Sequence, residues 1–273
     1  MKIFSGSRNN SDADIVAEVE KEFSDEIYAN GHLRPHERIV PLLHAFKHRH
    51  IFHLVFPWAD GGNLRDLWGR VQARLDDATL DWFWAQCLGL ADALAAVHDW
   101  RVLHNDIKPE NVLCFTREGG GGETDPDEPA AWELRVADFG ISQRVGAPDS
   151  MVEPTSRHVV TQRSPEFDLK YESVSFPVDI WSLGCVYLDF ITWLLLGNEE
   201  RLRFERRRVA ELGDPDGPGP PIEEDTYFKI INVPQPGIGE KTVKKVALVK
   251  DSVLEVRPIA NIRWRQTASL LSG

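Results

Sequence analysis

Apolar residues recur at helical spacing in three stretches of the chain. Residues 12 to 30 predict an amphipathic helix that ends at Asn30 and Gly31, with apolar positions at Ile15, Val16, Val19, Phe23 and Ile27. Residues 79 to 99 are rich in Ala, Leu and Trp and predict a long helix. Residues 178 to 196 predict a strongly apolar, buried helix, whose longest apolar run is too short to span a bilayer.

Three shorter apolar runs predict β-strands, at residues 51 to 56, 112 to 115 and 132 to 136. Pro57 and the turn at residues 60 to 62 end the first of them. Two stretches carry no apolar period. The glycine-rich, acidic residues 117 to 130 predict a disordered surface insert, and the Gly/Pro run at 212 to 222 predicts a loop.

Composition narrows the classes of partner. The 273 residues are 42% hydrophobic and carry a formal charge of −12, which supplies material for a sizeable core and an acidic surface. Such a surface repels nucleic acid and anionic membranes, so we expect neither as a partner. The three cysteines are far apart and favour a reducing compartment, and the N-terminus has no signal-peptide pattern. We therefore expect an intracellular protein, cytoplasmic or nuclear, and a monomer.

The candidate chemistry is concentrated in one loop, residues 104 to 111, with the sequence His-Asn-Asp-Ile-Lys-Pro-Glu-Asn. Phosphoryl transfer needs a carboxylate to orient the attacking hydroxyl, cations to neutralise phosphates, and oxygen ligands for Mg²⁺. Asp106, Lys108 and Asn111 supply one of each. Asp138, followed by Phe139 and Gly140 after a predicted strand, suits a second Mg²⁺ ligand.

These motifs resemble those of eukaryotic-type protein kinases, including kinase-like domains of filamentous fungi. Residues 104 to 111 resemble the catalytic loop H-R-D-x-K-x-x-N, and residues 138 to 140 match D-F-G. Residues 164 to 166 resemble A-P-E, residues 179 to 184 resemble D-x-W-S-x-G, and residues 265 to 268 resemble R-x-T-A, in the family's order. In that family the Arg of the last motif, here Arg265, pairs with the Glu of A-P-E, here Glu166.

The resemblance implies an α+β, protein-kinase-like fold of two lobes. It places an incomplete N-lobe sheet and a helix in residues 1 to 58, and a mainly helical C-lobe in residues 59 to 273. It also implies roles: Asp106 as catalytic base, Lys108 on the γ-phosphate of ATP, and Asn111 with Asp138 as ligands of Mg²⁺. Lys108 favours Ser/Thr over Tyr in a protein substrate.

The N-lobe resemblance adds Lys2, Glu26 and Ala59 to the predicted ATP site. Lys2, in Met-Lys-Ile-Phe, resembles the end of V-A-I-K, and Glu26 falls where kinases have the glutamate that pairs with this lysine. Phe56 falls at the gatekeeper position, and Ala59 in the segment that offers backbone groups to adenine.

The sequence departs from the family at three points. It contains no G-x-G-x-x-G, and Lys2 stands where the third strand of a kinase ends, so either it is part of a longer kinase or the short form is real. Asn105 replaces the Arg of H-R-D, which makes activation by loop phosphorylation doubtful. The segment from Thr161 to Ser164 is shorter than in the family, which affects peptide positioning.

Two alternatives to a protein kinase remain. A catalytically weak or inactive pseudokinase would act as a binding or scaffold module, and a small-molecule phosphotransferase would share the H-x-D-x-x-x-x-N loop. A basic run also stands out in this acidic chain, at Arg201, Arg203, Arg206, Arg207 and Arg208. We interpret it as a solvated helix face, with a docking patch for an acidic partner as the alternative.

Overall fold

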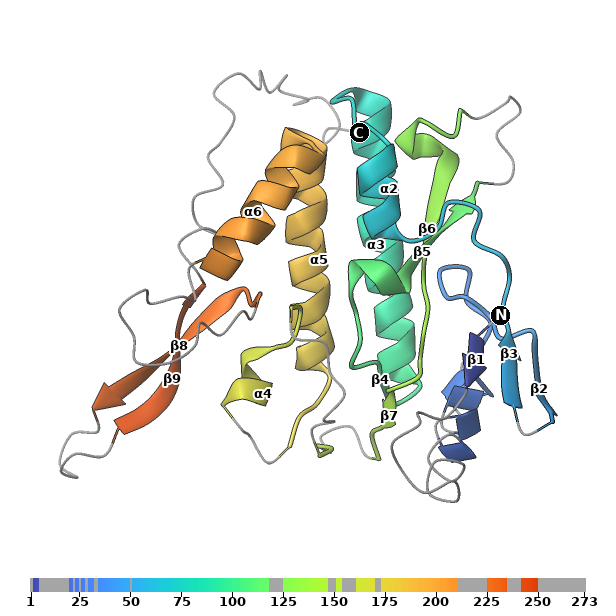
Figure 1. Cartoon of the computed structure of the whole chain (residues 1–273), viewed down its shortest axis with the longest axis horizontal. Helices are drawn as coiled ribbons and strands as arrows, with labels where there is room; N and C mark the ends of the chain where they lie inside the picture. Colours follow the sequence, from blue (N-terminus) through green and yellow to red (C-terminus); the bar gives the residue numbers. More distant parts are fainter. Residues whose placement is uncertain are drawn as a thin grey trace, which may run out of the picture.

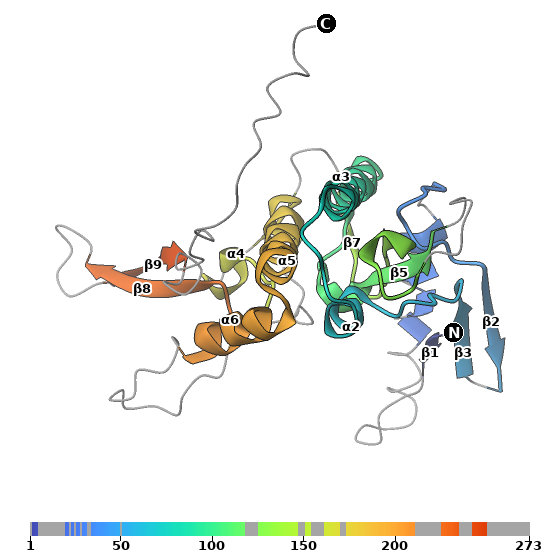
Figure 2. The same ribbon diagram turned by 90° about the horizontal axis from the view of Figure 1, so that it is seen from above.

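The structure is a computed structural model of the whole chain, and part of it is described here. The described residues are 2–4, 20–21, 23–24, 26–27, 29–31, 34–49, 51–117, 125–146, 151–153, 161–169, 173–210, 225–234 and 242–249. The N-terminal strands β1 to β3 and the hairpin β8–β9 lie at opposite ends of the molecule, with α3 and α5 between them (Figures 1 and 2).

The helices and strands follow the chain in a simple order. The strands are β1 (Lys2–Phe4), β2 (His44–His48), β3 (Ile51–Val55), β4 (Val102–Leu103), β5 (Val112–Thr116), β6 (Trp132–Val136), β7 (Gln143–Arg144), β8 (Phe228–Pro234) and β9 (Thr242–Val249). The helices are α2 (Leu64–Arg70), α3 (Asp77–Asp99), α4 (Pro165–Asp168), α5 (Pro177–Leu196) and α6 (Asn198–Ala210), with short 3₁₀ turns at Pro109–Asn111 and Pro129–Ala131.

The N-terminal part is a three-stranded antiparallel sheet in the order β1-β3-β2. The described residues between 20 and 31 are helical. Phe23 and Ile27 of this helix pack against Phe52 and Leu54 of the central strand, with the Phe23 and Phe52 rings 4.7 Å apart. This contact fixes the helix on the sheet, because alternate residues of β3 are buried on the same face.

The C-terminal part is built on α3 and α5. Both helices bury aromatic side chains in one core, where the Trp82 and Phe190 rings meet edge to face at 5.6 Å. Two of the buried indoles have a polar partner: Trp82 donates to the Trp132 carbonyl and Trp193 to the Trp68 carbonyl. This packing gives the catalytic segments a rigid support.

Backbone hydrogen bonds join the two parts directly. Val40 N–H donates to the Val136 carbonyl at 2.9 Å, and Val136 N–H donates to the Arg38 carbonyl at 2.8 Å. The Arg38 guanidinium also donates to Gln86 of α3 at 2.7 Å. The end of β6, where Asp138 follows, is therefore held by both parts.

The α+β, two-lobed architecture expected from the sequence is confirmed, with small sheets in the N-lobe and a mainly helical C-lobe. The long helices and the three strands lie within two residues of their predicted bounds. The boundary at residues 58 and 59 stays a prediction. The prediction of disorder over 117 to 130 is wrong at its end, because Pro129 and Ala130 belong to the 3₁₀ turn Pro129–Ala131, in which Pro129 is buried. Residues 118 to 124 and 212 to 222 lie outside the described residues.

Helix α5 has the length and hydropathy of a membrane span, although the longest uninterrupted apolar run within it is shorter. More than half of its most apolar window, 56%, is buried inside the protein. Its apolar residues therefore have protein neighbours, as in the central helix of a core.

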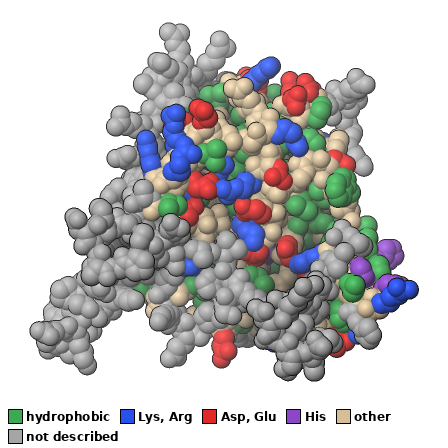
Figure 3. Space-filling model, in the orientation of Figure 1, with side chains coloured by type: hydrophobic (Ala, Val, Ile, Leu, Met, Phe, Trp, Pro, Cys, Tyr) green, Lys and Arg blue, Asp and Glu red, His purple; other side chains and the backbone are tan. Residues whose placement is uncertain are grey.

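The basic run on α6 corrects one interpretation. Arg203, Arg206 and Arg207 are exposed, and Figure 3 shows Lys and Arg side chains gathered over the region of α6. Arg201 and Arg208, however, are buried, so the run is not a uniformly solvated face. Arg208 donates to Asp225 at 2.8 Å and to Asp189 at 3.2 Å. Its guanidinium lies over the Phe204 and Tyr227 rings.

We predict that Arg208→Met destabilises the protein by about 3–5 kcal/mol, because the buried carboxylate of Asp189 loses its cation. Burial already raises the pKa of Asp189, and Arg208 opposes that rise. Arg203→Met is the control on the same helix. Arg203 pairs with Glu200 in solvent, so its replacement should change stability by less than about 0.5 kcal/mol. Urea unfolding measures both, and equal effects would contradict the structural role of Arg208.

Candidate active site

The loop that follows β4, residues 104 to 111, is anchored by Asp179, which lies near the start of α5. The Asp179 carboxylate accepts the backbone N–H groups of His104 and Asn105, each at 2.8 Å. The ring of His98 lies 2.9 Å from the same carboxylate, which is almost fully buried. Asn105 adopts a left-handed conformation with φ of 65°. The backbone that leads into Asp106 is therefore fixed by Asp179.

Asp106 is held by two neighbours from its own loop. The Lys108 ammonium donates to both of its carboxylate oxygens, at 2.9 and 3.1 Å. The Asn111 amide donates to the Asp106 carboxylate at 2.7 Å and to its backbone carbonyl at 2.8 Å. The three predicted residues therefore form one hydrogen-bonded group.

Asp138 follows β6 in a strained conformation. Its φ is 65°, and Gly140 N–H donates to its carboxylate at 3.2 Å. Phe139, next to it, is buried, with its ring 4.7 Å from that of His104. Because backbone strain of this kind persists only where the surroundings impose it, the packed Phe139 and the Gly140 contact fix the direction of Asp138.

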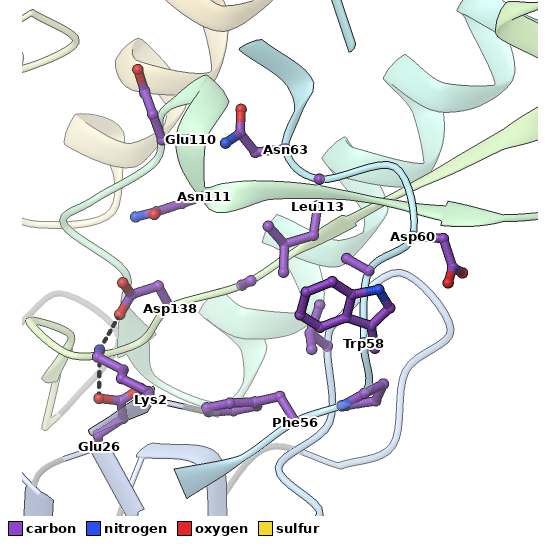
Figure 4. Close-up of a pocket in the computed structure, with 15 residues that line it drawn as sticks. Lys2, Glu26, Phe56, Trp58, Asp60, Asn63, Glu110, Asn111, Leu113 and Asp138 are labelled. Carbon is purple, nitrogen blue, oxygen red and sulfur yellow. Dashed lines mark hydrogen bonds and ion pairs between the residues drawn. The ribbon is translucent and has the colours of Figure 1, made fainter. Parts of the chain in front are cut away.

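Lys2 joins three parts of the chain at one ammonium group. It lies 2.7 Å from Glu26 and 2.7 Å from Asp138 (Figure 4). The Lys2–Glu26 pair implied by the resemblance is thus present, and Glu26 is fully buried. Gly140 leaves room for it, because a Cβ at that position would lie 2.8 Å from the Lys2 nitrogen.

The ion pair between Lys2 and Asp138 shifts the pKa of each group in the direction that keeps it charged. Burial alone would lower the pKa of Lys2, but the carboxylates of Asp138 and Glu26 outweigh burial and raise it. Burial alone would raise the pKa of Asp138, but Lys2 and the Gly140 N–H outweigh burial and lower it. Both groups are therefore charged at neutral pH.

A cavity of about 550 Å³ lies between the two parts of the chain, beside this group. Its inner wall is apolar, with Val40, Phe56, Leu113 and Ala137, and Ala59 borders it. Lys2, Asn111 and Asp138 line its polar end. Asp106 and Lys108 are not lining residues, and they adjoin the cavity through Asn111. The Ala59 carbonyl accepts the Gly62 N–H at 3.2 Å.

The cavity fits a nucleotide with its divalent cation. Its volume lies in the range of ligand sites, and an apolar wall with one charged end suits a base and a polyphosphate. Mg²⁺ prefers oxygen ligands and keeps substrate phosphates among them. Asp138 offers carboxylate oxygens, and Asn111, whose amide nitrogen is bonded to Asp106, offers its amide oxygen.

Sequence reasoning missed several residues of the site. Leu113 and Val40 form the apolar wall, and their strand and loop patterns alone do not reveal a ligand. Arg65 of α2 bridges Glu110, at 3.3 Å, and Glu205 of α6, at 2.8 Å, beside the catalytic loop. Asp179 begins the D-x-W-S-x-G resemblance, and that motif alone does not reveal its bonds to the backbone of the loop. Arg265 lies outside the described residues, so its predicted pairing with Glu166 stays a prediction.

Comparison with known proteins identifies the class. The protein kinase domain family matches residues 1–207, and the chain belongs to this family. It is 30% identical to myosin light chain kinase 3 of Homo sapiens over 165 residues. This aligned region is 59% of this chain and 17% of that protein. It is 28% identical over 170 residues to myosin light chain kinase family member 4 of Homo sapiens, which covers 61% of this chain and 38% of that protein. The chain thus spans well under half the length of these relatives.

We predict that Lys2→Met destabilises the protein by about 3 kcal/mol at pH 7, because the fully buried Glu26 carboxylate loses its cation, while solvent reduces the share of the half-exposed Asp138. The lowered pKa of Asp138 stabilises the fold above its unfolded value of 3.8. The raised pKa of Lys2 stabilises it below 10.5. The difference in unfolding free energy between parent and variant should therefore be largest between these two pH values. It should shrink as the pH falls below 3.8.

Urea unfolding at neutral and acidic pH measures this difference. Lys47→Met is the control in the same lobe, because Lys47 pairs with Glu20 at the surface and touches neither Glu26 nor Asp138. A Lys2→Met penalty that stays constant down to acidic pH would show that the ion pair is not its cause.

Proposed function

We propose that this protein kinase domain uses ATP and Mg²⁺ to phosphorylate Ser or Thr of a protein substrate. The observation that carries the proposal is the Lys2 ammonium, held between Glu26 and Asp138 at one end of the cavity. The relatives are myosin light chain kinases, and their names support a protein substrate. Lys108 in the catalytic loop supports Ser/Thr specificity by resemblance.

In this proposal Asp106 orients the attacking hydroxyl and accepts its proton. Its carboxylate is held by Lys108 and Asn111, so its direction is set before substrate arrives. The Lys108 ammonium lies next to that carboxylate, where it stabilises the negative charge that develops on the transferred phosphoryl group. Both side chains are mostly buried, which strengthens these interactions.

Lys2 binds the phosphates of the nucleotide, and Glu26 positions its ammonium. Asn111 and Asp138 would hold Mg²⁺, which when bound neutralises charge on the phosphates. Ala59 and the apolar wall bind the base. Because these groups are already in place in the structure, binding needs little rearrangement of the described residues.

We predict that Asp106→Asn lowers phosphorylation of a Ser/Thr peptide library by at least about 100-fold, since general-base assistance is lost. ATP affinity should stay unchanged, because Asp106 does not line the cavity. Asp81→Asn, at an exposed position of α3, is the control and should keep full activity. If Asp106→Asn phosphorylates as well as the parent, the role assigned to Asp106 is wrong. Aminoglycosides and choline, offered in parallel, test the small-molecule alternative.

We predict that ATP with Mg²⁺, at 100 times its dissociation constant, stabilises the protein by about 2.7 kcal/mol, because a ligand of the native state raises apparent stability. Asp138→Asn should reduce the Mg²⁺-dependent part of this effect. Thermal unfolding with and without Mg²⁺ measures both. No stabilisation of the parent at millimolar ATP would favour the pseudokinase alternative, a binding module without nucleotide.

A further inference from the structure

Arg65, on α2, holds two carboxylates that come from different parts of the chain. Its guanidinium donates to both oxygens of Glu205 on α6, at 2.8 and 2.9 Å. A second nitrogen of the same group donates to Glu110 of the catalytic loop at 3.3 Å. One side chain therefore links α2, α6 and the loop that carries the candidate catalytic residues.

The support behind this link distinguishes it from an ordinary surface ion pair. Single exposed pairs fix little, because solvent screens the charges and both side chains remain mobile. Two parallel hydrogen bonds to one carboxylate, in contrast, set the plane and the direction of the Arg65 guanidinium. Glu205 is itself held by Arg201 at 3.3 Å. The Arg201 guanidinium is buried over the Trp68 ring of α2, so the network is anchored in the interior of the C-lobe.

Glu110 connects this network to the site. It is the middle residue of the 3₁₀ turn Pro109–Asn111, against which α2 packs. The next residue, Asn111, donates to the Asp106 carboxylate at 2.7 Å. Figure 4 shows Asn111 between Glu110 and Asp138. A displacement of the turn would therefore move the Asn111 amide oxygen relative to both aspartates.

We propose that Arg65 is a positioning residue for the cation site. It acts through Glu110 to hold the 3₁₀ turn, and so keeps the Asn111 amide oxygen in the geometry that binds Mg²⁺. The inference rests on the proposed function, which assigns Asn111 to the cation. Arg65 and Glu205 do not line the cavity, whereas Glu110 does. Their effect on the cation must therefore pass through the turn, as for the outer residues that orient the ligands of other metal sites.

Hydrogen exchange in the protein without nucleotide gives the first readout. The Asn111 and Val112 N–H groups donate to the Lys108 and Pro109 carbonyls within the turn. Arg65→Met removes both ion pairs and keeps an apolar stem. We expect it to speed the exchange of these two amides about tenfold, as for the loss of a hydrogen bond to a charged group. Amides in the middle of α3 should exchange as in the parent.

Binding of the cation gives the second readout. In thermal unfolding with a non-hydrolysable ATP analogue, the Mg²⁺ concentration that gives half of the Mg²⁺-dependent stabilisation should rise about tenfold in Arg65→Met. The kcat for a Ser/Thr peptide should fall by a similar factor, and the KM for the peptide should stay unchanged. Arg65→Lys keeps the charge but loses the two parallel hydrogen bonds, so it should restore only part of the loss. Arg203→Met, at an exposed position of α6, is the control and should behave as the parent.

Glu205→Gln tests the route of the effect. It removes the carboxylate that holds Arg65 and leaves an amide oxygen for Arg201. This variant should shift the Mg²⁺ requirement in the same direction as Arg65→Met. The double variant should lose no more than Arg65→Met alone, since both substitutions remove one interaction. Two losses that multiply would show that Arg65 and Glu205 act separately, and would overturn the proposed route.

The outcomes separate a failure of the positioning role from a failure of the proposed function. If the parent binds the analogue with Mg²⁺ and phosphorylates peptides, and Arg65→Met matches it in loop exchange and Mg²⁺ requirement, the positioning role is overturned while the function stands. The same conclusion follows if only the KM for the peptide changes, because Arg65 then contacts the substrate, or if the loss of activity only follows a lower melting temperature. If the parent neither binds the analogue with Mg²⁺ nor phosphorylates peptides, the proposed function itself fails, and the inference fails with it.

Discussion

The whole site depends on one buried carboxylate, that of Asp179. A buried charge is costly unless donors surround it. Here the donors are two backbone N–H groups of the catalytic loop, His104 and Asn105, which would themselves be costly to bury unpaired. The hydrogen bonds therefore satisfy the buried carboxylate and the buried N–H groups at the same time. Asp179 lies in the first turn of α5, a helix whose residues belong to two buried apolar clusters, so the helix holds the loop in place. The left-handed turn at Asn105 immediately precedes Asp106.

A second set of hydrogen bonds connects Asp106 to the segment that carries Asp138. The side chain of Asn111 donates to Asp106, and its backbone carbonyl accepts the Ala137 N–H at 2.9 Å. Asp138 is the next residue, and it pairs with Lys2 of the small sheet. The two carboxylates thus belong to one connected group, although only Asp138 lines the cavity. In a phosphotransferase this division is useful, because one carboxylate faces the nucleotide and the other faces the attacking hydroxyl.

How much of this was predictable differs between the levels of structure. The long helices and the strands at 51, 112 and 132 have strong local periods, and their existence followed from the sequence. The residues of the catalytic loop and Asp138 followed from motif spacing. Local pattern could not reveal that Arg208 is buried, because its partners Asp189 and Asp225 come from other segments. The ordered end of the acidic insert has a similar cause. Ala130 packs against the core formed with α3 and β6, and the glycine-rich sequence before it does not indicate this contact.

The replacement of the usual arginine by Asn105 acquires a physical meaning in this structure. The Asn105 amide donates to the Ile141 carbonyl at 3.2 Å and to the Gln143 side chain at 3.0 Å. It therefore ties the catalytic loop to the segment that follows Asp138 by neutral hydrogen bonds. An arginine in this place would supply a cation, whose use depends on a negative partner. The neutral amide needs no such partner, because a backbone carbonyl and a side-chain oxygen on the next segment accept its N–H groups. Hydrogen bonds within the described chain thus connect the loop that carries Asp106 to the segment after Gly140.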